Sequence, residues 1–106
     1  MFNNCESLKT IDLSDFNANE VYNMSEMFYN CKSLESINLS NFYTYNVTNM
    51  RGMFYSCISL KSIDLSNFST KKVTNMSEMF FNIPKKCKIT CKDNKINNII
   101  KQCLIF

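Results

Sequence analysis

The feature of this sequence that most constrains its fold is a pattern that returns every 26 residues. The dipeptide Met-Phe occurs at 1–2, 27–28, 53–54 and 79–80. The same period links Cys5, Leu8, Ile11, Leu13, Phe16, Val21, Asn23 and Met24 to their counterparts in two further copies, with no insertion. A repeat of this length is typical of a solenoid, in which each unit buries its apolar face against the next one. We therefore predict an α/β solenoid of about four coils.

Each unit predicts one short parallel strand and one short helix. In residues 62–66, Ile63 and Leu65 alternate with polar residues, which is the period of a half-buried strand. In residues 24–31, Met and Phe fall at the spacing of one helix face. Asn23 and Glu26 have the spacing of a helix N-cap and its third residue. Gly52 replaces that acid in the middle copy, so we expect a weaker helix start there.

The chain of 106 residues is long enough for one domain. We place the solenoid at 1–83, as three units and the start of a fourth. Residues 84–106 form a degenerate last strand, in which Ile89 and Cys91 hold the strand positions, followed by a basic capping segment. Ile96, Ile99 and Ile100 in that segment predict a short amphipathic helix over the open end of the stack.

The sequence motifs of the repeat resemble those of a known family. Residues 47–50 and 73–76 both give VTNM, residues 27–34 give MFYNCKSL and residues 63–68 give IDLSNF. These motifs, over about residues 1–83, are similar to the BspA-type leucine-rich repeats. The resemblance implies a leucine-rich-repeat fold and a surface protein that takes part in adhesion and partner binding. Family members have more copies, and Met1 aligns with the middle of a unit, which is consistent with a truncated product or an incomplete gene.

The cysteines are predicted to be packing residues. Cys5, Cys31 and Cys57 occupy one repeat position, and its fourth copy is Ile83. A position that accepts Cys or Ile is a small apolar one, and free Cys is often buried. A disulfide and a zinc site are the alternatives. The chain has no His to complete a zinc site, and Cys87 is not at the usual zinc spacing from the next Cys.

The outward positions of the strands are the candidate binding face. They hold small polar and acidic residues: Thr10, Asp12, Ser36, Asn38, Ser62 and Asp64. Leucine-rich repeats usually bind partners on their concave face, so by analogy we predict a protein ligand there; a merely solvated sheet face is the alternative. Without His, and with Asp12 and Asp64 two strands apart on an open face, we expect no enzyme, cofactor or metal, and no nucleic-acid partner.

The C-terminus carries a second candidate site. Cys103 and the three residues that follow it match the C-a-a-X prenylation pattern, in which a terminal Phe is typical of geranylgeranyl transfer. Residues 1–84 have six basic and eight acidic side chains, whereas residues 85–106 have six lysines and one aspartate. Because one lipid chain alone anchors only reversibly, those lysines would supply the second signal.

These features predict a binding or adhesion module that is tethered to a membrane through lipidated Cys103, conditional on a eukaryotic host. Prenyl transfer is cytosolic, so the cytoplasmic leaflet is weakly favoured, whereas the resemblance favours the cell surface. The alternative is a structural fragment of a larger BspA-like surface adhesin without a lipid anchor.

Overall fold

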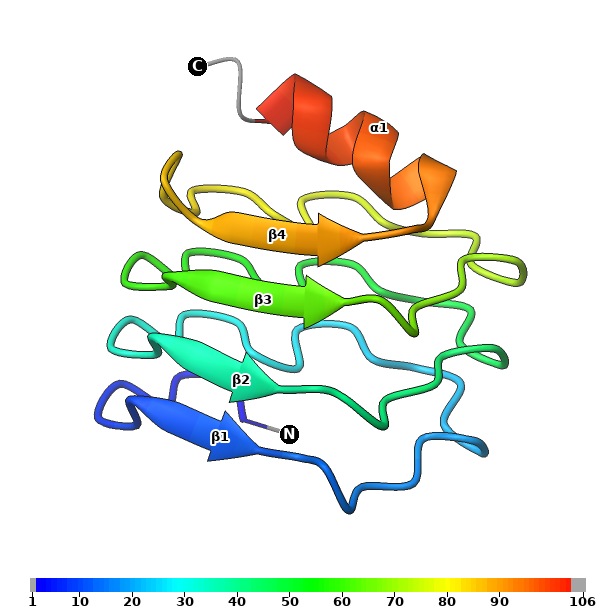
Figure 1. Ribbon diagram of the computed structural model, residues 1–106, viewed down its shortest axis with the longest axis horizontal. Coiled ribbons are helices and arrows are strands. Elements are labelled where there is room, and N and C mark those ends of the chain that lie inside the picture. The colour runs from blue at the N-terminus through cyan, green and yellow to red at the C-terminus, as the bar shows by residue number, and fades with distance from the viewer. Residues whose placement is uncertain (1, 104–106) are drawn as a thin grey trace.

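The computed structural model describes residues 2–103, and it shows a stack of coils covered at one end by a helix (Figure 1). Each coil contributes one strand: β1 (Thr10–Asp12), β2 (Ser36–Asn38), β3 (Ser62–Leu65) and β4 (Lys88–Cys91). The helix α1 (Asn94–Cys103) follows β4. The four strands form one parallel sheet in the order β1-β2-β3-β4, which confirms the predicted solenoid of about four coils. We call residues 2–26, 27–52, 53–78 and 79–91 coils 1 to 4.

The strands pair in the register that the sequence repeat predicts. Ile11 lies beside Ile37, Ile37 beside Ile63, and Ile63 beside Ile89, so each strand residue is paired with the residue 26 positions later. The Ile side chains of β1 to β3 are buried and their sequence neighbours are not. Because a one-residue slip would turn every Ile to solvent, this alternation fixes the register.

The prediction of one short helix in each coil is wrong. Residues 24–31 and their repeats form consecutive tight turns, and the helix within residues 2–103 is α1 alone. The reason lies in the backbone: Glu26, Gly52 and Glu78 have φ values of 57°, 59° and 58°, in the left-handed region. A second left-handed position follows four residues later, at Asn30, Ser56 and Asn82. A right-handed helix cannot pass through such residues.

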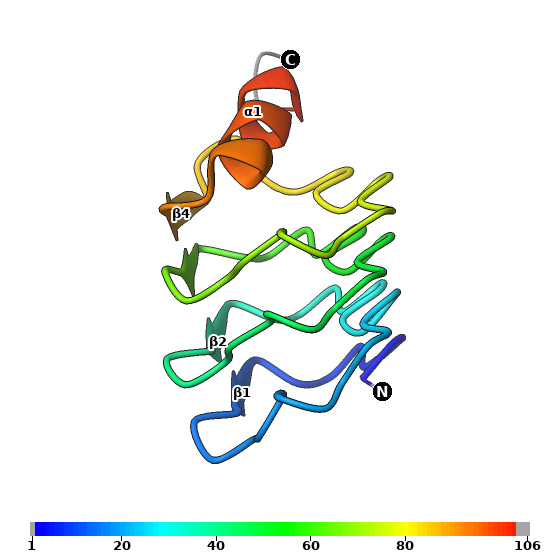
Figure 2. The same ribbon diagram turned by 90° about the vertical axis from the view of Figure 1, so that its right-hand side faces the viewer.

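The turns are held by hydrogen bonds between coils. On the turn side, the N–H groups of Met24, Glu26, Phe28 and Asn30 each donate to the carbonyl 25 residues later, at 2.8–2.9 Å. The pattern repeats at Met50, Gly52, Phe54 and Ser56. We call these turn-side bonds between coils the turn ladder. Figure 2 shows the strands along one side of the stack and the turns along the other. Both sides therefore satisfy their backbone groups by stacking, as a sheet does.

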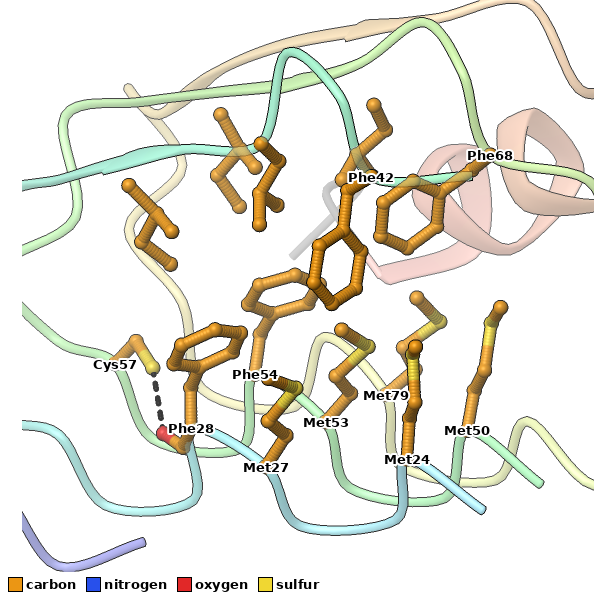
Figure 3. Close-up of a cluster of buried hydrophobic side chains, with 14 of the residues drawn as sticks. Met24, Met27, Phe28, Phe42, Met50, Met53, Phe54, Cys57, Phe68 and Met79 are labelled. Carbon is orange, nitrogen blue, oxygen red and sulfur yellow. Dashed lines mark hydrogen bonds between the residues drawn. The ribbon is translucent and has the colours of Figure 1, made fainter. Parts of the chain in front are cut away.

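The core between the sheet and the turns consists of stacked equivalents (Figure 3). Phe28 lies between Phe2 and Phe54 with ring centroids 5.8 and 5.5 Å apart, and Phe80 continues the column. A second column joins Phe42 to its counterparts in coils 1 and 3. Met50, Met53 and Met79 are completely buried beside these rings. The same side chain in each coil thus packs on its own copy, so the repeat supplies complementary surfaces automatically.

The helix α1 covers the last coil, as the sequence predicts. Its Ile96 is fully buried, and its Ile99 and Ile100 pack against the core. Asp93 begins the helix as its N-cap, because its Oδ1 accepts the N–H of Ile96 at 3.0 Å. The same carboxylate also accepts the N–H and the hydroxyl of buried Thr70. In coil 2 the equivalent Thr44 hydroxyl forms hydrogen bonds with the backbone of Ser69 in the next coil. Asp93 therefore supplies to Thr70 the hydrogen bonds that a further coil would otherwise provide.

Candidate binding face

The six predicted residues lie on one exposed face of the sheet. Thr10, Ser36 and Ser62 form one row across β1, β2 and β3, and Asp12, Asn38 and Asp64 form the next. Ser36 is half-buried, and the others are exposed. Adjacent strands in a sheet lie about 5 Å apart, so the structure brings all six together on one polar surface, which we call the sheet face.

The second of these rows has a structural task that the sequence analysis missed. Asp12, Asn38 and Asp64 each accept, through Oδ1, the backbone N–H two residues ahead, at 2.9, 3.1 and 2.9 Å. Such Asx turns bend the chain away from the end of each strand. Asp-x-Ser and Asn-x-Ser spacing is the sequence signal that identifies them. The polar row is therefore rigid, and its side chains have defined directions.

Hydrogen bonds favour the ionised form of both carboxylates on the sheet face. The backbone N–H of Ser14, and then its hydroxyl, lower the pKa of Asp12. The hydroxyl of Ser66, and then its N–H, lower the pKa of Asp64 in the same way. A hydrogen bond to the charged form favours that form. Asp12 and Asp64 also stand two strands apart, with Asn38 between them.

An ion pair borders the sheet face. Lys61 Nζ lies 2.7 Å from Glu35 Oε1, between neighbouring coils. Lys61 lowers the pKa of Glu35 mainly by hydrogen bonding, and Glu35 raises the pKa of Lys61 for the same reason. These residues precede Ser36 and Ser62 in the chain. The face therefore combines a neutral hydroxyl row, an acidic and amide row, and a charged margin.

The cysteines of the core are free thiols, and the predicted packing role is supplemented by a polar one. Cys31 and Cys57 are completely buried, and no disulfide occurs among Cys5, Cys31, Cys57, Cys87 and Cys91. The Sγ of Cys57 donates to the carbonyl oxygen of Phe28 at 3.1 Å (Figure 3), and Cys31 donates likewise to Phe2. In the described part of the chain, no cluster of three or more Cys, Asp or Glu is arranged to hold a metal ion.

The C-terminal candidate site is only partly described. Cys103 is the last residue of α1, while Leu104, Ile105 and Phe106 lie outside the described residues. The six tail lysines are all exposed, around β4 and α1: Lys85, Lys86, Lys88, Lys92, Lys95 and Lys101. Within residues 2–103, no helix has the length and apolar character that a membrane crossing needs.

Strand pairing, the stacked core and the polar sheet face define the chain as a solenoid repeat protein. It belongs to a family described as Mycoplasma protein of unknown function, DUF285, which matches residues 1–102. This is a BspA-related repeat family, in agreement with the resemblance seen in the sequence. Neither the curated proteins nor the solved structures contain a match to this chain.

Proposed function

We propose that this protein is a non-enzymatic binding module that holds a protein ligand on the sheet face. The observation that carries the proposal is the fixed polar row of Asp12, Asn38 and Asp64, whose side chains are oriented by Asx turns. A preorganised surface loses little conformational entropy on binding. Adhesion to a protein partner, which the BspA-type resemblance implies, is the use that fits such a surface.

The same features argue against catalysis. Asp12 and Asp64 are exposed carboxylates with lowered pKa values. General acid–base chemistry needs two groups whose environments separate their pKa values, within reach of one substrate. The sheet face offers recognition without that arrangement.

Crosslinking from a defined position tests the proposal. A photo-reactive residue replaces Asn38 on the sheet face, and a matched variant carries it at exposed Ile58, which lies in coil 3 outside the strands. After illumination in the native cell, the first variant should give a discrete protein adduct and the second should not. Equal adduct patterns from the two positions, or none from position 38, would contradict the sheet face as the binding surface.

A membrane tether, conditional on a eukaryotic host, is the second part of the proposal. It is supported by the position of Cys103 at the end of α1 and by the exposed lysines around it. Lysines near an anionic leaflet each add about 1 kcal/mol to membrane binding. A prenylated Cys103 would hold the basic end of the stack on the cytoplasmic leaflet and leave the sheet face free.

Mass spectrometry of the protein from its native cell tests the tether. The expected product carries a prenyl group on Cys103 and lacks the three residues after it, and Cys103→Ser should move the protein to the soluble fraction. An unmodified Cys103 would refute the tether and leave the structural-fragment alternative. Surface staining of unpermeabilised cells would refute the cytoplasmic placement.

A further inference from the structure

One edge of the stack gathers lysines, tyrosines and amides. It is formed by the loops that lead from the strands to the turn side, at residues 17–20 in coil 1, 43–46 in coil 2 and 69–72 in coil 3 (Figure 1). We call the surface of these three loops the loop corner. Because the loops are equivalent in the repeat, they lie side by side, and their sequences change from Asn-rich through Tyr-rich to Lys-rich along the stack.

The lysines of coil 3 reach across to coil 2. The Nζ atoms of Lys71 and Lys72 lie 5.6 and 4.7 Å from the centroid of the Tyr45 ring, and a cation is attracted by the face of an aromatic ring. Lys72 Nζ also donates to Asn46 Oδ1 at 3.0 Å. The Asn46 amide is itself held in place, because its Nδ2 donates to the carbonyl of Asn19 at 2.6 Å. Two ammonium groups are therefore positioned beside one exposed tyrosine.

A third ammonium group lies next to these two. Lys95 Nζ donates to the carbonyl of Val73 in coil 3 at 3.3 Å. Within residues 2–103, none of the three lysines forms an ion pair with a carboxylate. The Asp93 carboxylate is close in the fold, but it accepts hydrogen bonds from Thr70 and from the N–H of Ile96. The positive charge of the loop corner is therefore available to an anionic ligand.

The arrangement of the charges favours a linear polyanion. Lys71 and Lys72 contact coil 2 and Lys95 contacts coil 3, and neighbouring strands are about 5 Å apart, so the charges follow the axis of the stack. A membrane surface would instead match charges spread over a plane. A single-stranded nucleic acid needs free aromatic faces for its bases, and the two ammonium groups already lie over the Tyr45 ring.

The neutral groups around the lysines favour a sugar chain over an acidic peptide. Tyr43 and Tyr45 are each 50% exposed, and Asn17 and Asn19 are exposed in the loop of coil 1. Phenol and amide groups both donate and accept hydrogen bonds, as the hydroxyl groups of a sugar do. Glu20 is exposed at the coil 1 side of the corner, so an anionic ligand should lie over coils 2 and 3.

We propose that the loop corner binds a linear sulfated glycan. Its sulfate groups lie against Lys71, Lys72 and Lys95, and its sugar hydroxyls bond to the phenols and amides beside them. Lysine ammonium groups on flexible stems suit such sulfates, because each acts as a point charge without a fixed fork geometry. The site shares no residue with the sheet face, so it adds a second ligand to the proposed protein partner, and it goes with the cell-surface placement of the chain.

A heparin-derived oligosaccharide is the probe, used with the full chain. The same oligosaccharide without its sulfate groups, a poly-glutamate peptide and a single-stranded DNA of equal charge are the controls. The chain should bind the sulfated sugar saturably, more weakly at high salt, and more tightly than each control. Absence of binding, or equal binding of poly-glutamate or of the DNA, would overturn the proposal.

Matched variants separate the loop corner from basic charge in general. Lys71→Gln combined with Lys72→Gln should weaken binding of the sulfated sugar by about tenfold or more. Lys85→Gln combined with Lys86→Gln removes the same charge from an exposed pair that precedes β4, and should leave binding nearly unchanged. Equal losses from the two pairs would overturn the proposal. Crosslinking from position 38 tests the sheet face separately, so the failure of one proposal is distinguishable from the failure of the other.

Discussion

A buried thiol in this solenoid is also an inter-coil hydrogen-bond donor. Cys57 reaches the carbonyl of Phe28 in the preceding coil, and burial raises the pKa of its thiol to about 12. The thiolate is the reactive form, so Cys57 should resist alkylation at pH 8 until the chain unfolds. Half-exposed Cys5 is the internal control in the same protein. Mass-resolved labelling checks this, and equal labelling rates for Cys5 and Cys57 in the folded chain would contradict it.

One side chain of the phenylalanine column should contribute far more to the free energy of unfolding than a side chain on the sheet face. Phe54 is completely buried between Phe28 and Phe80. Phe54→Ala should lower the free energy of unfolding by about 3–5 kcal/mol, because both neighbours are held by their own coils and cannot fill the cavity. Ser62→Ala on the sheet face should change it by less than about 0.5 kcal/mol. Similar urea midpoints for the two variants would show that the core faces are assigned wrongly.

Gly52 discriminates between the helix expected from the sequence and the turn in the structure. Its φ is 59°, and a Cβ there would meet Tyr29 Cδ2 at 3.5 Å, an ordinary contact. Gly52→Ala should therefore destabilise the chain by about 1 kcal/mol, from backbone strain alone. In a helix interior the same change would stabilise by a similar amount. The sign of the shift in urea midpoint decides between the two.

At the scale of elements, the sequence predicts the strands and the cap but not the turns. Alternation of Ile with polar residues has one structural explanation, so β1 to β4 follow from it. The i, i+3, i+4 spacing of Met24, Met27 and Phe28 has two structural explanations, a helix and a series of tight turns, because tight turns also bring such residues to one side. The turns are indicated by small polar residues at one left-handed position, Asn30, Ser56 and Asn82, because such residues tolerate that conformation. The other left-handed position holds Glu26 and Glu78, which give no such indication. The sheet face follows from alternation too, whereas its Asx turns need the geometry.

The cap depends on one carboxylate. Burial, the largest single influence, acts to raise the pKa of Asp93, but hydrogen bonds from Ile96 and Thr70 together outweigh it and lower the pKa below 3.8. The unfolded chain then binds the proton more tightly than the folded chain. The stabilisation is therefore complete above the ordinary pKa and is lost as the pH falls through the lower folded value.

Asp93→Ala should lower the free energy of unfolding at pH 7 by about 1–2 kcal/mol, through loss of the N-cap of α1 and of the bond to Thr70. The difference from the parent chain should shrink below about pH 4, because the parent carboxylate is then protonated too. Urea unfolding at several pH values measures this. Asp15→Ala, at an exposed residue, is the control, and a difference that is independent of pH would contradict the role of the ionised carboxylate.

The whole molecule should tolerate removal of a coil in register. Deleting residues 27–52 places Thr10 and Ile11 beside Ser62 and Ile63, which are equivalent to their present partners. The shorter chain should fold in one transition with lower stability and a smaller urea m-value, since it has one coil–coil interface fewer. Deleting residues 27–46 removes a similar length but breaks the register, and that chain should not fold. Circular dichroism in urea compares the two, and equal stability would contradict a register-dependent stack.

The two hydrogen-bonded ladders run along the axis of the stack, and this determines how the protein responds to a pulling force. Tension applied between coil 1 and α1 loads the bonds of one coil at a time, so the chain should yield by peeling in sequence and not by sudden rupture. Each released coil of 26 residues adds on the order of 90 Å of contour at about 3.4 Å per residue. A molecule built this way would lengthen several-fold under load and dissipate energy at each step, as a compliant spacer does.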